Sequence, residues 1–266
     1  MTGTRGAGVI VLGGLVLLAI IAPWLSPADP FAMSGAALAP PASAHPFGTD
    51  DLGRDVFAGV LQGARTSLLV GLAAAACAIA IGLAVGGVAG MRGGAADNLL
   101  MRATEFVQVL PRFFLVVVIV SLFGGRLWLI VLVIGVTAWP ATARVFRAQV
   151  MSILARDFVL AARAAGSRDR DILTRHVLPL AAPVLAAQVS YQAGGAILAE
   201  AGLSFLGLGD PTVLSWGTQL GAAHHMVRAA WWMTLFPGLA ITLTVLGCNL
   251  IADSLSAREM DESGAF

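Results

Sequence analysis

The chain has 266 residues, of which 58% are hydrophobic and only 12% are charged. A soluble domain of this length needs far more charge on its surface, so a soluble enzyme or binding domain is excluded. Apolar runs of about 18 or more residues are typical of membrane-spanning helices. We therefore predict an all-α, polytopic membrane protein.

The net charge of +1 is uninformative, but the kind of basic residue is not. All sixteen basic residues are arginine. A phosphate-binding P-loop requires a lysine, so this chain cannot carry that ATPase motif. If ATP drives its function, another polypeptide must hydrolyse it.

Residues 1–66 are predicted to form one span and one loop. An apolar run of about spanning length at 7–25 makes residues 1–26 a first transmembrane helix. A signal peptide is the alternative, although no clear cleavage pattern stands near Trp24. Residues 27–66 form a loop, proline-rich at first, with an amphipathic helix over 50–63.

Acidic residues near the start of that helix allow two interpretations. Either Thr49 or Asp50 is predicted as the N-cap. Asp50, Asp51 and Asp55 could instead suggest a metal site, but capping together with a solvated face is the favoured interpretation.

Five further apolar runs complete a single transmembrane domain, residues 1–266. We predict spans at 67–90, 106–123, 127–142, 178–201 and 231–252. Residues 67–255 then form a five-helix core, and residues 256–266 form a short tail. Glycines in the 67–90 run favour close helix packing in lipid.

Six spans place both termini on one side, and arginine identifies that side. With the termini in the cytoplasm, twelve arginines lie on the cytoplasmic side or near it and four lie outside. This agrees with the positive-inside rule. Residues 256–266 and the polar segment 156–179 are therefore predicted to be cytoplasmic.

Ionisable residues within or beside the spans are candidates for the translocation path or its gate. Glu105 and Arg112 are seven residues apart, which would place them on one helix face, where they could be partners or gate residues. Arg112 either reaches the membrane interface or lines a water-filled path. Glu200, at the outer end of its span, is either functional or an interfacial carboxylate facing water.

Neither the cysteines nor the paired histidines indicate a metal site. Cys77 and Cys248 lie inside apolar runs and are expected to pack there. Adjacent histidines in a helix point about 100° apart, so His224 and His225 are interpreted as surface residues. We expect this chain to bind no metal and no cofactor.

The segment 156–179 carries the clearest local pattern. Good helix formers precede Gly166, which is a natural helix stop. Ser167 then offers an N-cap for a second helix that Pro179 ends or bends. The first helix places one aromatic and three small residues on one face: Phe158, Ala161, Ala162 and Ala165.

Cytoplasmic loops of membrane proteins are commonly rich in arginine, so the arginines of this segment alone indicate no function. That explanation does not account for the helix pair and its alanine face. LAARAAG followed by HVLP resembles the EAA motif of binding-protein-dependent ABC importer permeases, with Leu160 at the glutamate position and His176 at the isoleucine position. Other stretches resemble the C-type subunit of dipeptide, oligopeptide and nickel permeases. These stretches are HPFGTDDLGRDVFAGVLQGARTSLLVG, AILAEAGLSFLGLG with SWG, and PGLAITLTVLGCNLIADSL.

The resemblance implies a type I ABC importer permease (MetI-like) fold in a bacterial inner membrane. It also implies a B-type permease partner, two ATPase subunits or one fused ATPase that hold ATP and Mg, and an extracytoplasmic solute-binding protein. Nucleic acid is not an expected partner. The residues expected to couple to the ATPase are Phe158, Ala161, Ala162, Arg163, Ala165, Gly166, Arg168 and Pro179.

Several alternatives stay open. The imported solute could be a dipeptide, an oligopeptide, nickel, glutathione or haem. A stand-alone secondary transporter would leave the arginine segment with a role in topology only, and the absence of an internal repeat speaks against it. A membrane-embedded enzyme is disfavoured because neither HExxH nor GxSxG occurs in the spans.

Overall fold

The computed structural model describes residues 2–25 and 29–263, and it confirms an all-α architecture. Within these residues the only β-type pairings are two isolated bridges near the start of α2. The α-helices are α1 Thr2–Leu25, α2 Val56–Arg92, α3 Gly94–Val109, α4 Arg112–Phe123, α5 Leu127–Leu154, α6 Asp157–Ala164, α7 Asp169–Ile172, α8 Leu178–Phe205, α9 Trp216–Ala223 and α10 Trp232–Ser263.

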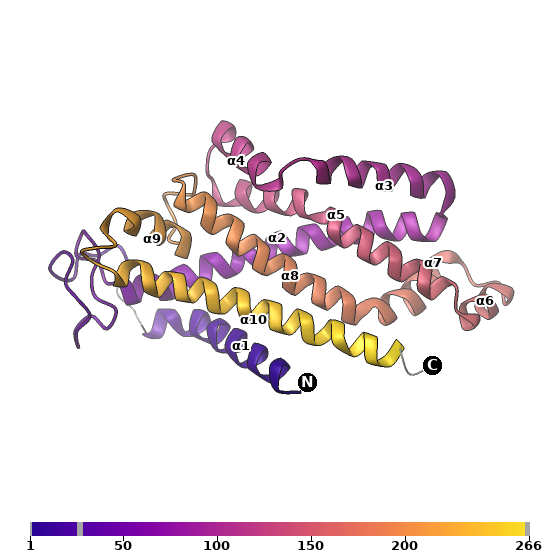
Figure 1. Ribbon diagram of the computed structural model, residues 1–266, viewed down its shortest axis with the longest axis horizontal. Helices are drawn as coiled ribbons and strands as arrows, with labels where there is room; N and C mark the ends of the chain where they lie inside the picture. The colour runs from indigo at the N-terminus through magenta and orange to yellow at the C-terminus, as the bar shows by residue number, and fades with distance from the viewer. Residues whose placement is uncertain (1, 26–28, 264–266) are drawn as a thin grey trace.

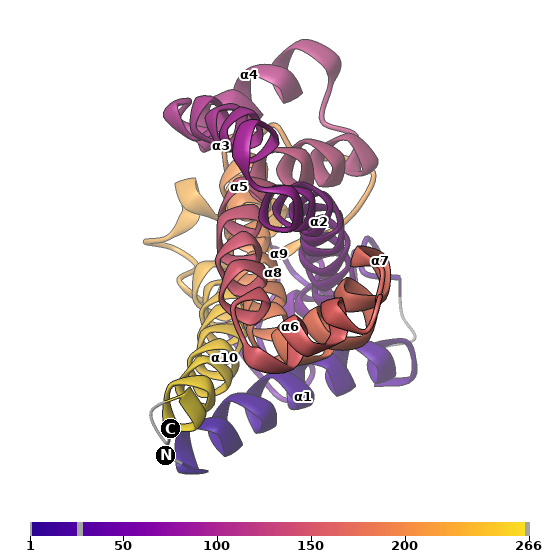
Figure 2. The ribbon, with the colours of Figure 1, turned by 90° about the vertical axis from the view of Figure 1, so that its right-hand side faces the viewer.

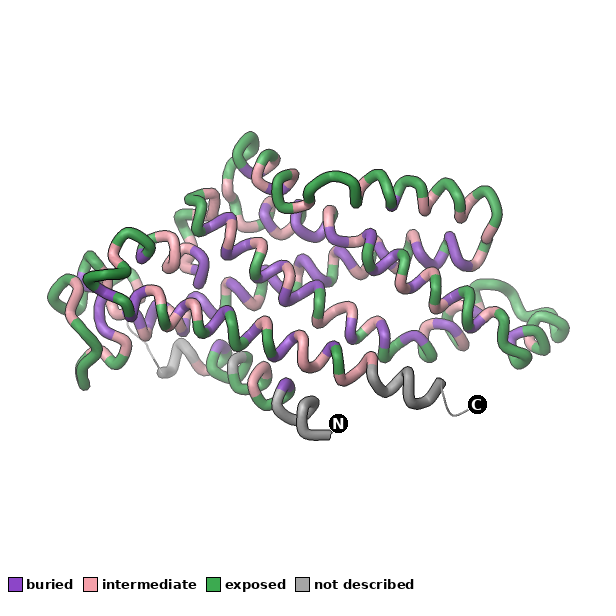
Figure 3. Tube along the Cα trace, viewed as in Figure 1, coloured by how far each residue is buried: buried purple, intermediate pink, exposed green. Residues whose placement is uncertain are grey.

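The long helices form an elongated bundle with different structures at its two ends (Figure 1). The loop 29–55 and α9 lie at one end, which we call the loop end. Helices α6 and α7 lie at the other, which we call the α6 end. Figure 2 looks onto the α6 end and shows α3 and α4 beside the rest of the bundle. Buried positions run along the centre of α2, α5 and α8, whereas α3 and α4 are largely exposed (Figure 3).

Four helical stretches are long and apolar enough to cross a membrane, namely α2, α5, α10 and the continuous stretch Asp169–Phe205. Helices α3 and α4 pass the same test together but are bent by 74°. In α1 the apolar stretch Gly8–Ile21 is shorter. The total of six spans and the cytoplasmic position of both termini stay predictions.

Close packing of α2 on α5 depends on small residues, as the glycine-rich sequence predicts. A Cβ added at Gly82 would lie 2.6 Å from Cβ of Thr142, and one at Gly135 would lie 2.7 Å from Cβ of Cys77. Gly86 lies against the carbonyl oxygen of Ala143. Glycine at these points lets the two backbones approach in a membrane, where packing rather than water drives association.

Two helix boundaries were predicted wrongly. The amphipathic segment is not a separate helix, because α2 runs unbroken through it from Val56 to Arg92. Its N-cap is Asp55, not Thr49 or Asp50: the Asp55 side chain accepts hydrogen bonds from the backbone N–H groups of Phe57 and Ala58. The predicted span 106–123 is also not one helix, since the chain bends at Leu110 and Pro111.

Of the two outcomes predicted for Pro179, ending its helix or bending it, the structure excludes the first. A π-helical turn, Leu173–Val177, precedes Pro179, and the N–H of Leu178 bonds to the carbonyl of Leu173. The helix then continues to Phe205. A proline removes one i→i−4 hydrogen bond and crowds the preceding turn, and the wider π turn makes room for the ring.

Candidate functional site

Gly166 ends α6 as predicted. Its φ of +86° is in the left-handed region that favours glycine. The N–H of Gly166 bonds to the carbonyl of Arg163 at 2.9 Å, and that of Ser167 bonds to the carbonyl of Ala162 at 3.0 Å. These two bonds form a Schellman motif. The prediction for Ser167 was wrong, since Arg168 occupies the N-cap of α7, without a side-chain bond, and Ser167 closes the Schellman motif instead.

A buried apolar cluster anchors this segment to the bundle. Val159 of α6 and Ile172 of α7 are both 0% exposed. They belong to one cluster with Phe146, Val150 and Ile153 at the end of α5. Sequence analysis missed these anchors, although Val159 and Ile172 are the β-branched apolar residues of the two short helices. Their burial makes the α6–α7 unit a fixed extension of α5 and α8.

The predicted coupling residues lie mostly on the opposite, open side of the unit. Phe158 is 42% exposed and packs beside His176, with 5.8 Å between ring centroids. Ala162 is the one member that is half-buried. The other predicted residues are exposed: Ala161, Arg163, Ala165, Gly166, Arg168 and Pro179. The chain therefore presents a surface of small and basic residues on a rigid support.

Leu160 occupies the position at which the EAA motif has its glutamate. Its side chain is 52% exposed, on the same helix as the alanines. Arg163 forms a single ion-pair contact of 3.7 Å with Asp169, and both side chains are exposed. A pair of this kind contributes little free energy. Contact with a partner here would therefore combine apolar packing at Leu160 and Phe158 with arginine charge.

Glu200 is buried, so the interpretation of an interfacial carboxylate facing water was wrong. It is 2% exposed, and its Oε1 accepts hydrogen bonds from Ser204 Oγ at 2.6 Å and Ser215 Oγ at 2.7 Å. Its Oε2 has no hydrogen-bond partner. Ser215 is also the N-cap of α9, in a capping box with Thr218. Glu200 thus attaches α9 to the end of α8.

Glu105 and Arg112 do not come together. Because the chain bends between them, they belong to different helices, α3 and α4. Glu105 is exposed, whereas Arg112 donates from Nη2 to the carbonyl of Ile134 in α5 at 3.3 Å. The predicted pairing on one helix face was therefore wrong, and Arg112 instead connects α4 to α5.

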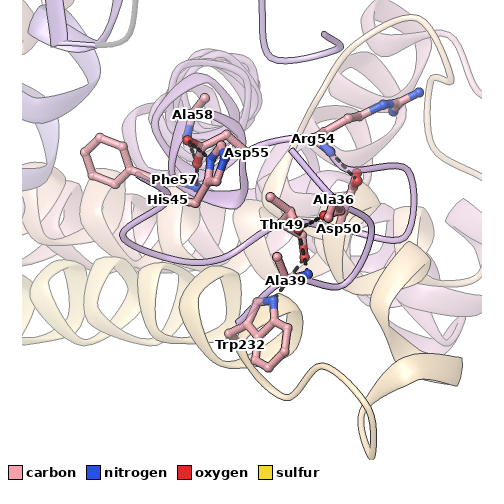
Figure 4. Close-up of polar contacts among 10 residues, drawn as sticks. All are labelled: Ala36, Ala39, His45, Thr49, Asp50, Arg54, Asp55, Phe57, Ala58 and Trp232. Carbon is pink, nitrogen blue, oxygen red and sulfur yellow. Dashed lines mark hydrogen bonds and ion pairs between the residues drawn. The ribbon is translucent and has the colours of Figure 1, made fainter. Parts of the chain in front are cut away.

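Hydrogen bonds within the loop 29–55, and between this loop and α10, stabilise the loop end of the bundle (Figure 4). Trp232 Nε1 donates to the carbonyl of Thr49 at 3.0 Å, and the Thr49 hydroxyl donates to the carbonyl of Ala36 at 2.6 Å. Asp50 accepts from the N–H of Arg54 at 2.7 Å, and His45 Nδ1 lies 3.1 Å from Asp55 Oδ2. Capping and turn formation account for these acids, as favoured from the sequence.

Within the described residues, no group of three or more His, Cys, Asp or Glu side chains could hold a metal ion. The rings of His224 and His225 lie 3.5 Å apart between centroids and are tilted by 45° to each other. Cys77 and Cys248 are both free thiols.

Other polar contacts connect the spans. Tyr191 of α8 donates to Asp253 of α10, and Gln192 donates to the carbonyl of Ala138 at 2.9 Å. Arg147 of α5 forms a two-bond ion pair with Asp97 of α3. None of these pairs was predicted from the sequence, because each joins residues 50 to 62 positions apart.

The architecture defines a class: a polytopic helical membrane protein with an anchored, exposed helix pair at one end. The family of binding-protein-dependent transport system inner membrane components matches residues 52–258. The chain belongs to this family of ABC transporter permease subunits, which are transport subunits and not catalytic enzymes.

Named relatives support this membership over most of the chain. A protein of Brucella suis named as a peptide permease is 38% identical over 256 residues, which cover 93% of this chain and 83% of the relative. A second Brucella suis protein, named as a permease of a peptide transport system, is 38% identical over 250 residues, with 93% and 84% covered. The dipeptide transport system permease protein DppC of Bacillus subtilis is 37% identical over 252 residues, with 94% and 79% covered. The resemblance to C-type peptide permeases is therefore confirmed.

Proposed function

We propose that this chain is one permease subunit of an ATP-driven importer for dipeptides or oligopeptides in a bacterial inner membrane. Its family is described as binding-protein-dependent, and relatives at 37–38% identity are named for peptide or dipeptide transport. A B-type permease subunit would complete the path, and an extracytoplasmic binding protein would deliver the peptide. Nickel, glutathione and haem are the alternative solutes.

The α6 surface is the proposed site of coupling to a separate ATPase. The observation that carries this proposal is the contrast within one segment: Val159 and Ile172 are buried against α5, while Phe158, Ala161 and Gly166 are exposed. An anchored helix with small exposed side chains allows close seating of a partner. It also transmits displacement as a rigid body, which a mobile loop would not do.

Electrostatics favour a partner groove with acidic residues. Arg163 and Arg168 are exposed beside the alanine surface. Basic side chains at the rim of an interface mainly set specificity and the rate of association. ATP and Mg would then be bound by the partner, because this chain has no lysine for a P-loop.

Bulky substitutions test the coupling surface. Gly166→Trp and Ala162→Trp should prevent the ATPase from co-purifying with the tagged chain while membrane insertion stays normal. Ala42→Trp is the control, because Ala42 is exposed, as Gly166 is, but lies in the loop 29–55 at the other end of the bundle. Normal peptide uptake by the Gly166 variant would reject the coupling proposal. Purification of the chain alone, with uptake in vesicles lacking ATP, would reject the importer itself.

A further inference from the structure

Asp97 of α3 and Arg147 of α5 form the only arginine–carboxylate pair with two hydrogen bonds in the described part of the chain. Arg147 donates from Nε to Asp97 Oδ1 and from Nη2 to Oδ2, the second bond measuring 2.6 Å. The side chains are 13% exposed at Asp97 and 29% exposed at Arg147. A two-bond arginine–carboxylate pair fixes orientation as well as distance, which a single contact does not.

Arg147 and Asp97 belong to helices that are buried in the bundle to very different extents. Arg147 follows Phe146, which is in the cluster that anchors Val159 of α6. Asp97 lies in the first turn of α3, where the helix dipole favours an acid. Thr104 is the one buried residue described in α3. The only side-chain hydrogen bonds described between α3 and α5 are those of this pair.

Helix α3 leads directly into the bent junction with α4. The junction at Leu110 and Pro111 turns the chain by 74°, and α4 then contacts α5 through Arg112 and the carbonyl of Ile134. The α3–α4 unit is thus attached to α5 by an arginine contact at the start of α3 and by another at the start of α4, beside the junction. The attachment at the α6 end is the Asp97–Arg147 pair.

We propose that Asp97 and Arg147 are positioning residues that transmit displacement of α6 to α3. The inference rests on the proposed coupling role of α6. Helix α4 packs on α5 through the buried side chains of Val116 and Val120, whereas Thr104 is the one buried residue described in α3. Packing alone therefore attaches α3 weakly, so the pair determines whether α3 follows α5. Loss of the pair uncouples the two: α6 still moves with the ATPase, but α3 stays behind.

The test uses three variants of the full transporter reconstituted with its ATPase, partner permease and binding protein. These are Asp97→Asn, Arg147→Gln and the charge swap Asp97→Arg with Arg147→Asp. Each single variant should lower the peptide taken up per ATP hydrolysed by about tenfold, as expected for a coupling energy typical of contacting residues. The swap should recover a large part of this loss. Arg102→Gln, at an exposed position of the same helix, is the control.

A distance measurement separates transmission from a merely structural role. Spin labels are placed at exposed Leu99 in α3, at exposed Asp157 in α6, which is not one of the proposed coupling residues, and, as reference, at Leu69 in α2, after removal of the native cysteines. In the parent, ATP should change both the 69–157 and the 69–99 distances. In Asp97→Asn, only the 69–157 distance should change.

Two outcomes overturn this inference while leaving the proposed coupling role of α6 intact. If the 69–99 distance changes equally in Asp97→Asn and the parent, the pair transmits nothing. If the charge swap is as defective as the single variants although it folds, the pairing itself is not what matters. A third outcome, failure of the 69–157 distance to respond to ATP in the parent, would reject the proposed coupling role of α6 and this inference with it.

Discussion

The backbone N–H of Leu127 donates a 2.9 Å hydrogen bond to Asp210 Oδ2, which joins residues 83 positions apart. Leu127 begins α5, and its N-cap residue Arg126 provides no side-chain cap. Asp210, in the loop after α8, supplies the missing cap from another part of the chain. The loop end of α5 is therefore stabilised by tertiary structure and not by its own sequence.

Replacing Asp210 with alanine should lower the free energy of unfolding by about 1 kcal/mol, the usual cost of a lost N-cap. Thermal unfolding of the detergent-purified protein at pH 7 measures the change. Asp210→Asn keeps an accepting oxygen and is expected to lose less. Equal stability of the alanine variant and the parent would show that the bond contributes nothing.

The contribution of Asp210 should also depend on pH. The hydrogen bond from the Thr212 hydroxyl lowers the pKa of the Asp210 carboxyl most; bonds from the N–H groups of Leu127 and Thr212 and the charge of Arg126 add to this, while partial burial opposes it. A carboxyl with a lowered folded pKa stabilises the protein above its unfolded pKa, about 3.9. That stabilisation is lost as pH falls through the folded pKa. The difference in unfolding temperature between the parent and Asp210→Ala should accordingly shrink between pH 6 and pH 3, whereas a constant difference would contradict the assignment.

Glu200 should respond differently to two substitutions. Glu200→Ala leaves the hydroxyls of Ser204 and Ser215 buried without their acceptor, which is expected to cost about 2 kcal/mol or more. Glu200→Gln keeps an accepting oxygen and the side-chain volume, so its loss should be smaller. Thermal unfolding ranks the two. A glutamine variant less stable than the alanine variant would contradict this account, because it would show that the accepting oxygen and the side-chain volume at position 200 do not stabilise the protein.

Glycine packing between α2 and α5 is testable with a matched pair of alanine substitutions. Gly82→Ala would place its methyl group 2.6 Å from Cβ of Thr142, so the helices must separate, and overpacking of this kind costs about 1–3 kcal/mol. Gly195→Ala meets nothing within 4 Å and gains helix propensity. Unfolding of both variants in detergent should show a loss for the first and none for the second.

The anchor of the α6–α7 unit can be weakened without touching its exposed surface. Ile172→Ala removes a fully buried side chain, which typically costs about 2–5 kcal/mol. Much of this effect should be local, seen as faster hydrogen exchange in α6 and α7. Leu160→Ala, at a 52% exposed position on α6, is the control and should leave exchange unchanged. Equal exchange in the two variants would mean that Ile172 does not anchor the unit.

Much of the fold follows from local patterns. Long apolar runs predict spanning helices because an unpaired backbone is too costly in lipid. The stop at Gly166 follows from its tolerance of positive φ. Capping by an acid near the start of α2 follows from where acids bond to backbone N–H groups, although the cap is Asp55 and not the predicted Thr49 or Asp50. These features involve neighbours within a few residues, so one chain segment contains all the information needed.

The predictions from sequence were wrong or incomplete where a bend or a neighbouring turn determines which residues meet or where a helix begins. Glu105 and Arg112 have helical spacing, but a bend at Pro111 separates them. Pro179 was predicted to end or bend its helix, and the helix continues through it after a π turn. Ser167 has the chemistry of an N-cap, but it closes the preceding Schellman motif instead.

The sequence by itself determined that this is a helical membrane protein of the ABC permease family, with a helix–glycine–helix segment exposing small residues. Those properties depend on hydrophobicity and local backbone preference. Only the tertiary structure decided which polar residues meet: Asp97 with Arg147, Glu200 with Ser215 and Asp210 with Leu127. Such pairs depend on how helices far apart in the chain pack against one another, and no spacing within one segment encodes that.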